Sequence, residues 1–388
     1  MDPVYETYNM TYVTQRLQIL HLAYEDPRQP GSGGGSVRTW EINRRLADRH
    51  DISVITAGYR GAVARVEDGV RWIPLRPRTG GKIDRLAYFA QAGPALHWRS
   101  HDLVIEDFGA PFSTAFAPLF THAPVIASVQ WMFAREMRRK YHLPFDRVEQ
   151  FGIKRYDDFI TVSSWLAREV GQRKPEAIIE SIPNGVDDVA FTIEPTRPAH
   201  LLFVGRLDQA QKGADLLLDV YARLCQRSEG PPPPLLIIGD GPDRRALAAQ
   251  AERLGLAARV EFRGRVEGVE KYRLMSAAFA VLMPSRFETF GMVAAEALAV
   301  GVSLVAFDIG PMREVVGGGG AYLVPPFDLD CFTSVVLNVI TDRNAHVRAR
   351  ELGRTWAQRY RWDEIALRQE RHYLQTVGRS NEKNARGG

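Results

Sequence analysis

The chain has 388 residues, of which 45% are hydrophobic and 25% charged, and a formal net charge of +4. This length suits two domains, and the composition excludes a disordered or membrane-embedded chain. The mild positive charge permits an anionic ligand but gives no reason to expect a nucleic-acid partner. The two cysteines, Cys225 and Cys331, provide neither a disulfide framework nor metal-ligand spacing. We therefore expect no metal site, and we expect the protein to lie in a reducing compartment.

Both ends of the chain are predicted to lie outside the folded domains. Residues 1–16 lack the apolar core of a secretion signal, so we interpret them as a flexible extension. Residues 378–388 are small or polar, which predicts a disordered tail. No stretch approaches the roughly twenty apolar residues that span a bilayer. We therefore expect a cytoplasmic protein, with at most peripheral contact with the inner face of a membrane.

Short apolar runs alternate with helix-like segments in the first half of the chain. A strand is predicted at 17–22, followed by a glycine-rich loop and a helix at 37–49 with apolar residues at helical spacing. A second helix is predicted at 83–98. Further strands are predicted at 52–56, 70–75, 103–105, 124–129, 159–162 and 178–182. This alternation predicts a doubly wound parallel α/β domain over residues 17–190.

The same pattern begins again after a polar linker at 187–200. Strands are predicted at 201–204, 235–238, 260–262, 280–283, 304–307 and 322–324. Helices are predicted at 214–225, 243–254, 269–278, 329–340 and 347–360, with another that begins at Gly291. Residues 191–361 thus form a second predicted doubly wound domain, and a helix at 362–377 is expected to cross back to the first. Two such Rossmann-like domains facing each other would line one cleft with the loops at their strand ends.

The first predicted loop carries several glycines, at positions 31 and 33–35. A dinucleotide fingerprint would need a third glycine where Ser36 stands. It would also need an acidic residue after the second strand, but Asp51 comes before that strand. A nicotinamide site is therefore not expected. Glycines before a helix nevertheless expose backbone amides that an anion can approach. Gly33, Gly34 and Gly35 are therefore a candidate anion site, with a plain surface loop as the alternative.

Two glutamates lie in the stretch 284–299, where an apolar strand leads through a polar loop into an alanine-rich helix. Glu288 is expected in the loop and Glu296 within the helix, about 12 Å apart along its axis. This separation suits two ends of a long ligand better than one reacting bond. The helix N-terminus at Gly291 favours a phosphate between them. The alternative is a capping glutamate followed by a solvated one.

Two cations follow the first strand of the second domain. Arg206 and Lys212 both lie where a strand ends and a helix begins, on the side where such sheets bind ligands. Together they can neutralise a diphosphate, the arginine as a planar fork and the lysine as a point charge. Ordinary surface positions are the alternative.

These residues resemble the large family of retaining, nucleotide-sugar-dependent glycosyltransferases with the GT-B architecture of two Rossmann-like domains. The resemblance rests on Arg206, on Lys212 with Gly213, and on Glu288 and Glu296 with seven residues between them. Supporting motifs lie at 182–187, 238–242 and 262–264, and in the helix that begins at Trp362. The resemblance covers nearly the whole chain; its motifs are specific in the second half and generic in the first. It implies that the domain at 17–190 lies on the acceptor side and that the domain at 191–361 binds the nucleotide sugar.

The resemblance implies a metal-independent hexosyltransferase without a cofactor. It would move a sugar from a UDP-sugar, or less favourably a GDP-sugar, to a hydroxyl of a glycan, a lipid-linked acceptor or a small-molecule glycoside. Arg206 and Lys212 would hold the diphosphate and stabilise the leaving charge, and Glu288 would hold the donor sugar; these three are the catalytic candidates. The other donor-binding candidates are Gly33, Gly34 and Gly35 (phosphate), Gly264 and Arg265 (base), Phe290, Gly291 and Met292 (sugar) and Glu296 (ribose).

One position departs from the family pattern. The family often has a histidine near the donor sugar just after the strand at 124–129, and this chain has Gln130 there. Glutamine can hydrogen-bond to a sugar hydroxyl but carries no charge near neutral pH. The departure implies an atypical donor sugar, with an altered 6-position, or a different alignment of this segment.

Aromatic or apolar and basic side chains interleave over residues 131–141. They are Trp131, Phe133, Met137 and Tyr141, with Arg135, Arg138, Arg139 and Lys140. Such a mixture is typical of a surface that contacts anionic lipid or an acidic acceptor. A helix with one buried aromatic side and one solvated basic side is the alternative.

Three other functions fit the pattern less well. A nucleotide-sugar epimerase of the same fold would use the diphosphate site but needs acids and bases around the sugar. A non-catalytic sugar-nucleotide-binding protein would not need the intact set of two cations and two glutamates. A glycosidase needs two carboxylates about 5–9.5 Å apart and no paired cations. Glycosyl transfer is therefore the predicted reaction class.

Overall fold

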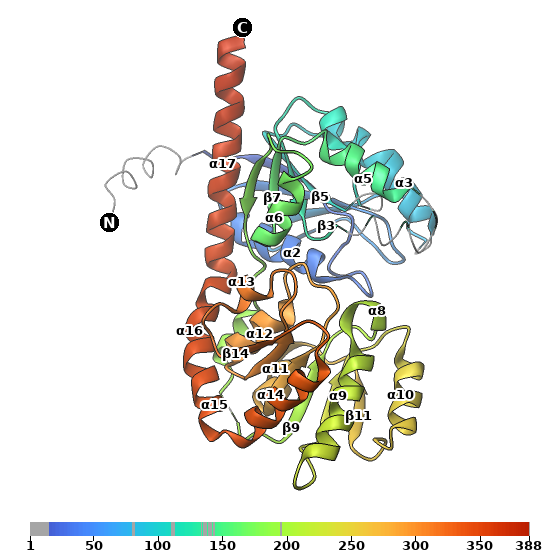
Figure 1. The fold of residues 1–388 in the computed structure, drawn as a ribbon. Helices are drawn as coiled ribbons and strands as arrows, with labels where there is room; N and C mark the ends of the chain where they lie inside the picture. Colours follow the sequence, from blue (N-terminus) through green and yellow to red (C-terminus); the bar gives the residue numbers. More distant parts are fainter. Residues whose placement is uncertain are drawn as a thin grey trace, which may run out of the picture. The chain divides into compact units, whose positions relative to one another are not determined.

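The computed structural model describes residues 15–387 apart from 80–81, 110–112, 133, 135–137, 139–141, 143 and 195 (Figure 1). The predicted N-terminal extension up to residue 14, and most of the basic aromatic stretch at 131–141, lie outside the described residues. The chain forms two compact α/β units. Unit 1 contains the chain up to Pro183 and again from Asp363 onward, and unit 2 is Asn184–Trp362.

Unit 1 is built on an eight-stranded sheet in the order β3-β4-β2-β1-β5-β6-β7-β8. Its strands are β1 (Gln18–Leu22), β2 (Asp51–Thr56), β3 (Arg65–Glu67), β4 (Val70–Pro74), β5 (Leu103–Phe108), β6 (Val125–Val129), β7 (Asp158–Thr161) and β8 (Ile178–Ser181). Neighbouring strands are parallel except for β3 and β4. The strand order reverses between β1 and β5, where Ile19 pairs with Leu103. This is the switch point at which doubly wound sheets bind ligands.

Helices connect these strands. They are α2 (Gly34–Leu46), α3 (Lys82–Ala92), α5 (Phe145–Ile153) and α6 (Ser164–Gly171), with short 3-10 turns η1 (Pro94–Trp98) and η2 (Ala117–Leu119). The helix predicted at 83–98 is therefore two pieces, because Pro94 cannot continue α3. The last helix, α17 (Trp362–Gly387), is anchored to the sheet by Asp158 at the start of β7, which accepts hydrogen bonds from His372 at 2.6 Å and Thr376 at 2.7 Å.

Unit 2 is built on a six-stranded sheet in the order β11-β10-β9-β12-β13-β14, parallel throughout. The strands are β9 (His200–Val204), β10 (Leu235–Ile238), β11 (Val260–Gly264), β12 (Ala278–Met283), β13 (Leu304–Phe307) and β14 (Ala321–Val324). Strands such as β10 and β13 are apolar at every position because helices cover both faces of a parallel sheet. The switch point lies between β9 and β12, so the loops that follow these two strands are where a ligand is expected.

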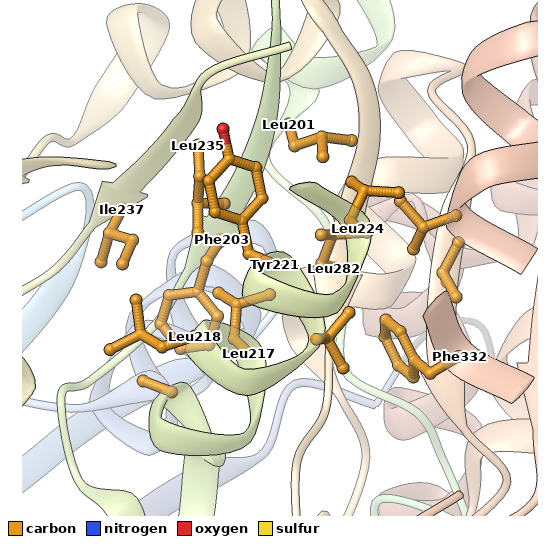
Figure 2. Close-up of a cluster of buried hydrophobic side chains, with 14 of the residues drawn as sticks. Leu201, Phe203, Leu217, Leu218, Tyr221, Leu224, Leu235, Ile237, Leu282 and Phe332 are labelled. Carbon is orange, nitrogen blue, oxygen red and sulfur yellow. The ribbon is translucent and has the colours of Figure 1, made fainter. Parts of the chain in front are cut away.

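A hydrophobic core cluster of unit 2 lies where two helices pack on the sheet (Figure 2). The helices are α9 (Ala214–Arg227) and α14 (Leu329–Thr341). Buried residues of α9, among them Leu217 and Tyr221, lie against Phe203 of β9 and Ile237 of β10, with Phe332 of α14 beside them. Each such large side chain contributes about 1.5–3 kcal/mol when fully buried. This packing fixes the strand ends from which the site loops emerge.

The helix after β12, α12 (Met292–Val300), is apolar around its whole circumference and buried along most of its length. It packs among α7 (Asp188–Thr192), α11 (Gly268–Ser276), α13 (Met312–Val316) and α16 (Arg354–Ala357). The remaining helical segments of unit 2 are α8 (Gln209–Lys212), α10 (Arg244–Arg253), α15 (Arg343–Arg348), the π-helical η3 (Ala349–Gly353) and η4 (Gln358–Tyr360). The one charged residue of α12, Glu296, is consequently buried.

The structure also differs from the sequence expectations at 187–200, at 347–360 and in the C-terminal tail. The segment at 187–200 is not simply a linker: it contains α7, which packs on α11 and α12, so the boundary lies after Pro183 instead of after residue 190. The helix expected at 347–360 is broken into α15, η3, α16 and η4. Residues 378–387 are helical and not disordered, because extending an existing helix through good helix formers such as Glu382 and Lys383 costs far less than starting one.

Within the described part of the chain, none of the helices has both the length and the apolar character needed to cross a bilayer.

Candidate functional site

The carboxylate of Glu288 lies in a polar cluster just after β12. Its side chain is 6% exposed. Both of its oxygens accept hydrogen bonds from Lys212 Nζ, at 2.8 and 3.0 Å, and Ser285 Oγ donates to Oε1 at 2.8 Å. Charge pairing and hydrogen bonds offset the cost of burying such a carboxylate. The structure thus brings two of the three predicted catalytic residues into direct contact.

Lys212 reaches Glu288 because the loops after β9 and β12 approach each other closely. Lys212 ends α8, and the next residue, Gly213, has a φ of +65°. A Cβ at Gly213 would lie 2.0 Å from the carbonyl oxygen of Pro284, so glycine is required at this position. Since β9 and β12 flank the switch point, the ion pair lies where ligands of this fold bind.

Arg286 holds the same two loops together. Its guanidinium forms a two-pronged ion pair with Asp215 at the start of α9, with both N–O distances 2.7 Å. It also donates to the carbonyl oxygen of Gln209 at 2.6 Å. The hydrogen bond to Asp215 is the main cause that raises the pKa of Arg286 above its ordinary value. Arg286 is therefore a structural support for the Lys212–Glu288 pair.

Arg206, the third predicted catalytic residue, lies in a turn with a tightly held backbone. Gly205 N donates to Ile238 O at 3.0 Å, and a Cβ at Gly239 would lie 1.8 Å from Gly205 O. The Arg206 side chain is exposed and forms no hydrogen bond or ion pair with any other residue that the structure describes. Its guanidinium is therefore available to an anion at the carboxyl end of β9.

Glu296 is paired with a residue that the sequence did not single out. Its side chain is 9% exposed, and Lys271 Nζ, from α11, donates to its Oε1 at 2.8 Å. The ammonium group also lies 4.4 Å from the centre of the Tyr272 ring. A buried carboxylate on an otherwise apolar helix needs a cation from a neighbouring element. The need for such a cation was the only feature of the sequence from which a partner such as Lys271 could have been predicted.

The start of α12 presents the backbone of Phe290, Gly291 and Met292. Gly291 precedes the helix in the left-handed conformation, with φ +92°. The ring of Phe290 is buried and packs edge-on against Tyr360, with ring centroids 5.6 Å apart. Phe290 can therefore contact a ligand through its backbone but not its ring. The first amides of a helix have no partner within it, so this end can bind an anion.

Gly264 and Arg265, predicted to lie along a nucleobase, lie at the carboxyl end of β11 in the sheet of unit 2. Gly264 ends β11, and its carbonyl oxygen accepts a hydrogen bond from Gly239 N at 2.8 Å. Arg265 is exposed and pairs with Glu267 at 3.3 Å. An exposed pair of this kind contributes little to stability, so Arg265 can exchange partners at small cost.

Unit 1 brings the glycine loop and Gln130 together. A Cβ at Gly35 would lie 3.7 Å from Gln130 Cγ, so the loop after β1 approaches the loop after β6. Gly33 precedes α2, and its amide donates to Glu25 Oε2 at 3.0 Å. Around a Cβ at Gly34, no other described atom would lie within 4 Å. The sequence did not single out Glu25, whose carboxylate holds an amide predicted to bind phosphate.

Two family models match consecutive parts of the chain. Residues 32–189 match the model described as Glycosyltransferase Family 4, and residues 188–356 match the model described as Glycosyl transferases group 1. The first range includes the glycine loop and Gln130. The second includes Arg206, Lys212 and both glutamates.

Curated relatives of similar length are glycosyltransferases. The phosphatidyl-myo-inositol mannosyltransferase of Mycobacterium tuberculosis is 30% identical over 335 residues, covering 80% of this chain and 84% of the relative. The enzyme of the same name from Mycolicibacterium smegmatis is 32% identical over 374 residues, covering 89% and 91%. The 2-deoxystreptamine N-acetyl-D-glucosaminyltransferase of Streptomyces fradiae is 25% identical over 356 residues, covering 81% and 84%.

Solved structures share the fold across both units. Sucrose-phosphate synthase from Thermosynechococcus elongatus aligns with a TM-score of 0.76 at 18% identity, covering 94% of this chain and all of that one. HepE from Anabaena, in complex with UDP-glucose, aligns with a TM-score of 0.69 at 19% identity, covering 95% and 100%. Two Rossmann-like sheets, the two glutamates of unit 2 and these relatives show that the chain belongs to the group 1 glycosyltransferases of GT-B fold.

Proposed function

We propose that the protein moves a hexose-type sugar from a nucleoside-diphosphate sugar to an acceptor hydroxyl, with retention of configuration and without a metal ion. The main support is the Lys212–Glu288 pair at the same strand ends as the exposed guanidinium of Arg206. Two cations at the switch point can neutralise the charge that builds on a departing diphosphate. The protein's own side chains would then supply the stabilisation that the leaving group needs.

In this proposal the donor diphosphate binds Arg206, Lys212 and the first amides of α12. Lys212 Nζ gains a phosphate oxygen as a partner, and Glu288 accepts hydrogen bonds from the sugar hydroxyls. Glu296 accepts hydrogen bonds from the ribose hydroxyls and shares its carboxylate with Lys271. Hydrogen bonds to a charged group are worth roughly 1.5–3 kcal/mol each. Gly264 and Arg265 would lie along the base.

The proposed reaction exchanges one bond at the anomeric carbon. The bond to the diphosphate oxygen breaks, and the acceptor oxygen forms a bond to the same carbon on the same face. The acceptor proton passes to the leaving phosphate. The enzyme contributes positioning and charge stabilisation, without a covalent intermediate on a side chain. Unit 1 would bind the acceptor, and its glycine loop and Gln130 would contact the donor phosphate and sugar through neutral hydrogen bonds.

We propose UDP-sugars first and GDP-sugars second as donors. A similar structure holds UDP-glucose, whereas the relatives named above include mannosyl- and N-acetylglucosaminyltransferases. The proposed acceptor is a glycan, a glycolipid or a small-molecule glycoside. Cytoplasmic location and peripheral contact with an anionic membrane through residues 131–141 complete the proposal. In that stretch Arg138 is described, and its side chain pairs with Asp146 at 2.6 Å.

The test is donor consumption with stereochemical analysis. The purified chain is incubated without acceptor with UDP-glucose, UDP-galactose, UDP-N-acetylglucosamine or GDP-mannose, and the sugar first released is followed by proton NMR. We expect slow release of the α-anomer from one of these α-linked donors. Arg206→Met should abolish the release, whereas Arg223→Met, which removes a partly exposed cation paired with Asp330 on α14, should not. Release of the β-anomer would contradict retention, and equal rates in both variants would remove Arg206 from the mechanism.

A further inference from the structure

A fully buried arginine lies one turn into the helix that follows the glycine loop. Arg38 of α2 is 2% exposed, and it is among the largest fully buried side chains of the described chain. Burial lowers the pKa of its guanidinium to about 10, the main cause being loss of solvent. An arginine is almost never buried to this extent without specific partners. The identity of those partners therefore indicates what Arg38 does.

Two of its partners lie on the two segments by which the chain leaves and re-enters unit 1. Arg38 NH1 donates to the carbonyl oxygen of Pro183 at 2.6 Å, and Pro183 is the last residue before the chain enters unit 2. Arg38 NH2 donates to Gln369 Oε1 at 2.5 Å. Gln369 lies on α17, two turns after the chain returns at Asp363. One guanidinium thus holds both segments to α2.

The same two segments are also joined to each other within unit 2. Val186 N donates to Tyr360 O at 2.8 Å, and Val186 forms a parallel bridge with Arg361. A Cβ at Gly185 would lie 2.3 Å from the Trp362 ring, so the chain passes directly against the start of α17. The outgoing and returning segments are therefore paired just inside unit 2 and bound by Arg38 just inside unit 1.

We propose that Arg38 is a positioning residue for the transfer reaction. It couples the outgoing segment at Pro183 and the returning segment at Gln369 to the glycine loop at the start of α2. A displacement of either segment is transmitted through the guanidinium to α2. It reaches Gly33–Gly35 because they lie at most one turn and a half from Arg38. This inference rests on the proposed role of the glycine loop in binding the donor. Replacing Arg38 leaves two acceptors, Pro183 O and Gln369 Oε1, without this donor and so lowers stability whatever its role. The test therefore needs readouts other than stability.

The test compares three variants of the full chain. Arg38→Met keeps the apolar stem and removes the donors, and Arg38→Lys retains one charged donor group. Arg379→Met is the matched control, because Arg379 also joins α17 to the sheet of unit 1, through Asp158 at 2.5 Å, but lies ten residues beyond Gln369. Hydrogen–deuterium exchange is followed over residues 31–39, and the hydrolysis of UDP-glucose or GDP-mannose gives kcat and KM. Titration with UDP and GDP gives the dissociation constant for unit 2.

For Arg38→Met we expect exchange over residues 31–39 to rise at least fivefold and kcat to fall at least tenfold. The UDP or GDP dissociation constant should stay within twofold, because that nucleotide site lies in unit 2. Arg38→Lys should recover part of kcat, and Arg379→Met should keep kcat within twofold. An Arg38→Met enzyme with unchanged kcat, or an Arg379→Met enzyme with an equal loss, would overturn the inference.

Failure of the proposed function would be distinguishable from failure of this inference. A wild-type chain that consumes neither donor and binds neither nucleotide would contradict the proposed function. In that case the exchange measurement alone decides the role of Arg38. Faster exchange over residues 31–39 in Arg38→Met but not in Arg379→Met supports the coupling, and unchanged exchange overturns it.

Discussion

Lys212 binds both carboxylate oxygens of Glu288 although 76 residues separate them in the chain. Each of the two is proposed to contact a different part of the donor, the lysine its diphosphate and the glutamate its sugar. In the protein without a ligand, the ion pair holds both side chains in position and each charge neutralises the other. Binding groups that are oriented in advance need no reorganisation when charge develops on the leaving group.

Lys212→Met should lower both the rate and the stability. Loss of a group that stabilises the leaving charge should reduce kcat for donor consumption about 10²- to 10³-fold. Glu288 would remain buried without its cation, so the free energy of unfolding should fall by about 1–3 kcal/mol. Urea unfolding and a donor-consumption assay measure the two effects.

The double variant Lys212→Met/Glu288→Gln separates these two effects. Because it removes both charges together, it should regain most of the lost stability but none of the lost rate. A double variant as unstable as Lys212→Met would show that the unpaired carboxylate is not the cause of the destabilisation.

Glu296→Ala should weaken nucleotide binding. If the carboxylate binds the ribose hydroxyls, loss of its charged hydrogen bonds costs roughly 1.5–3 kcal/mol, or about 10- to 150-fold in the dissociation constant. Isothermal titration with the preferred nucleotide measures this change. Glu180→Ala, which breaks the Glu180–Arg368 pair at 2.6 Å in unit 1, should leave the constant unchanged. Equal binding by both variants would remove Glu296 from the nucleotide site.

Glu25→Gln should tighten donor binding. In the free protein the Glu25 carboxylate holds the amide of Gly33, which is proposed to bind the donor phosphate. Glutamine keeps an acceptor oxygen for that amide but removes the charge that repels phosphate. An anion at a helix N-terminus is worth about 0.3–1 kcal/mol, so KM for the donor should fall about 2- to 5-fold. A higher KM in this variant would mean that the glycine loop does not bind the phosphate.

Glu106 should make stability depend on pH. It is fully buried on β5 and accepts hydrogen bonds from Tyr156 OH at 2.6 Å and Ala117 N at 2.9 Å, yet burial raises its pKa from 4.5 to about 7. The folded state therefore binds this proton more tightly than the unfolded state. Its contribution to stability is full below pH 4.5 and is lost as the pH rises through about 7.

A comparison with Glu106→Gln isolates this effect, because glutamine is neutral at every pH. The loss of unfolding free energy caused by Glu106→Gln should be about 2–3 kcal/mol smaller at pH 8 than at pH 5, because one pKa unit corresponds to about 1.4 kcal/mol. Urea unfolding at both values measures the difference. A cost that does not change with pH would show that Glu106 keeps an ordinary pKa.

The sequence predicted the strands more reliably than the connections between them. β10 and β13 were predicted residue for residue, since a continuous apolar run bounded by turns has few other interpretations. β5 was predicted to end at residue 105, where the apolar run gives way to the acidic pair Glu106 and Asp107. The strand instead continues to Phe108, and Glu106 is buried through the hydrogen bonds that it accepts.

The candidate site could be predicted where its residues follow strand ends, and not where they depend on packing. Arg206, Lys212 and Glu288 were singled out because they follow β9 and β12, the strands at the switch point. Lys271, Glu25 and Arg38 were not, because their roles depend on which helix or loop packs beside them. Such contacts between residues far apart in the chain leave no local pattern of spacing.

The most direct test of the proposed donor site is thermal unfolding with UDP, GDP, dTDP, ADP or NAD, each at the same excess, for the wild type and for Glu296→Ala. A ligand at a hundred times its dissociation constant adds about 2.7 kcal/mol, enough to raise Tm by several degrees. We predict a shift with UDP or GDP in the wild type and a smaller shift in Glu296→Ala. A shift with NAD alone, or equal shifts in the two proteins, would contradict the nucleotide site assigned to unit 2.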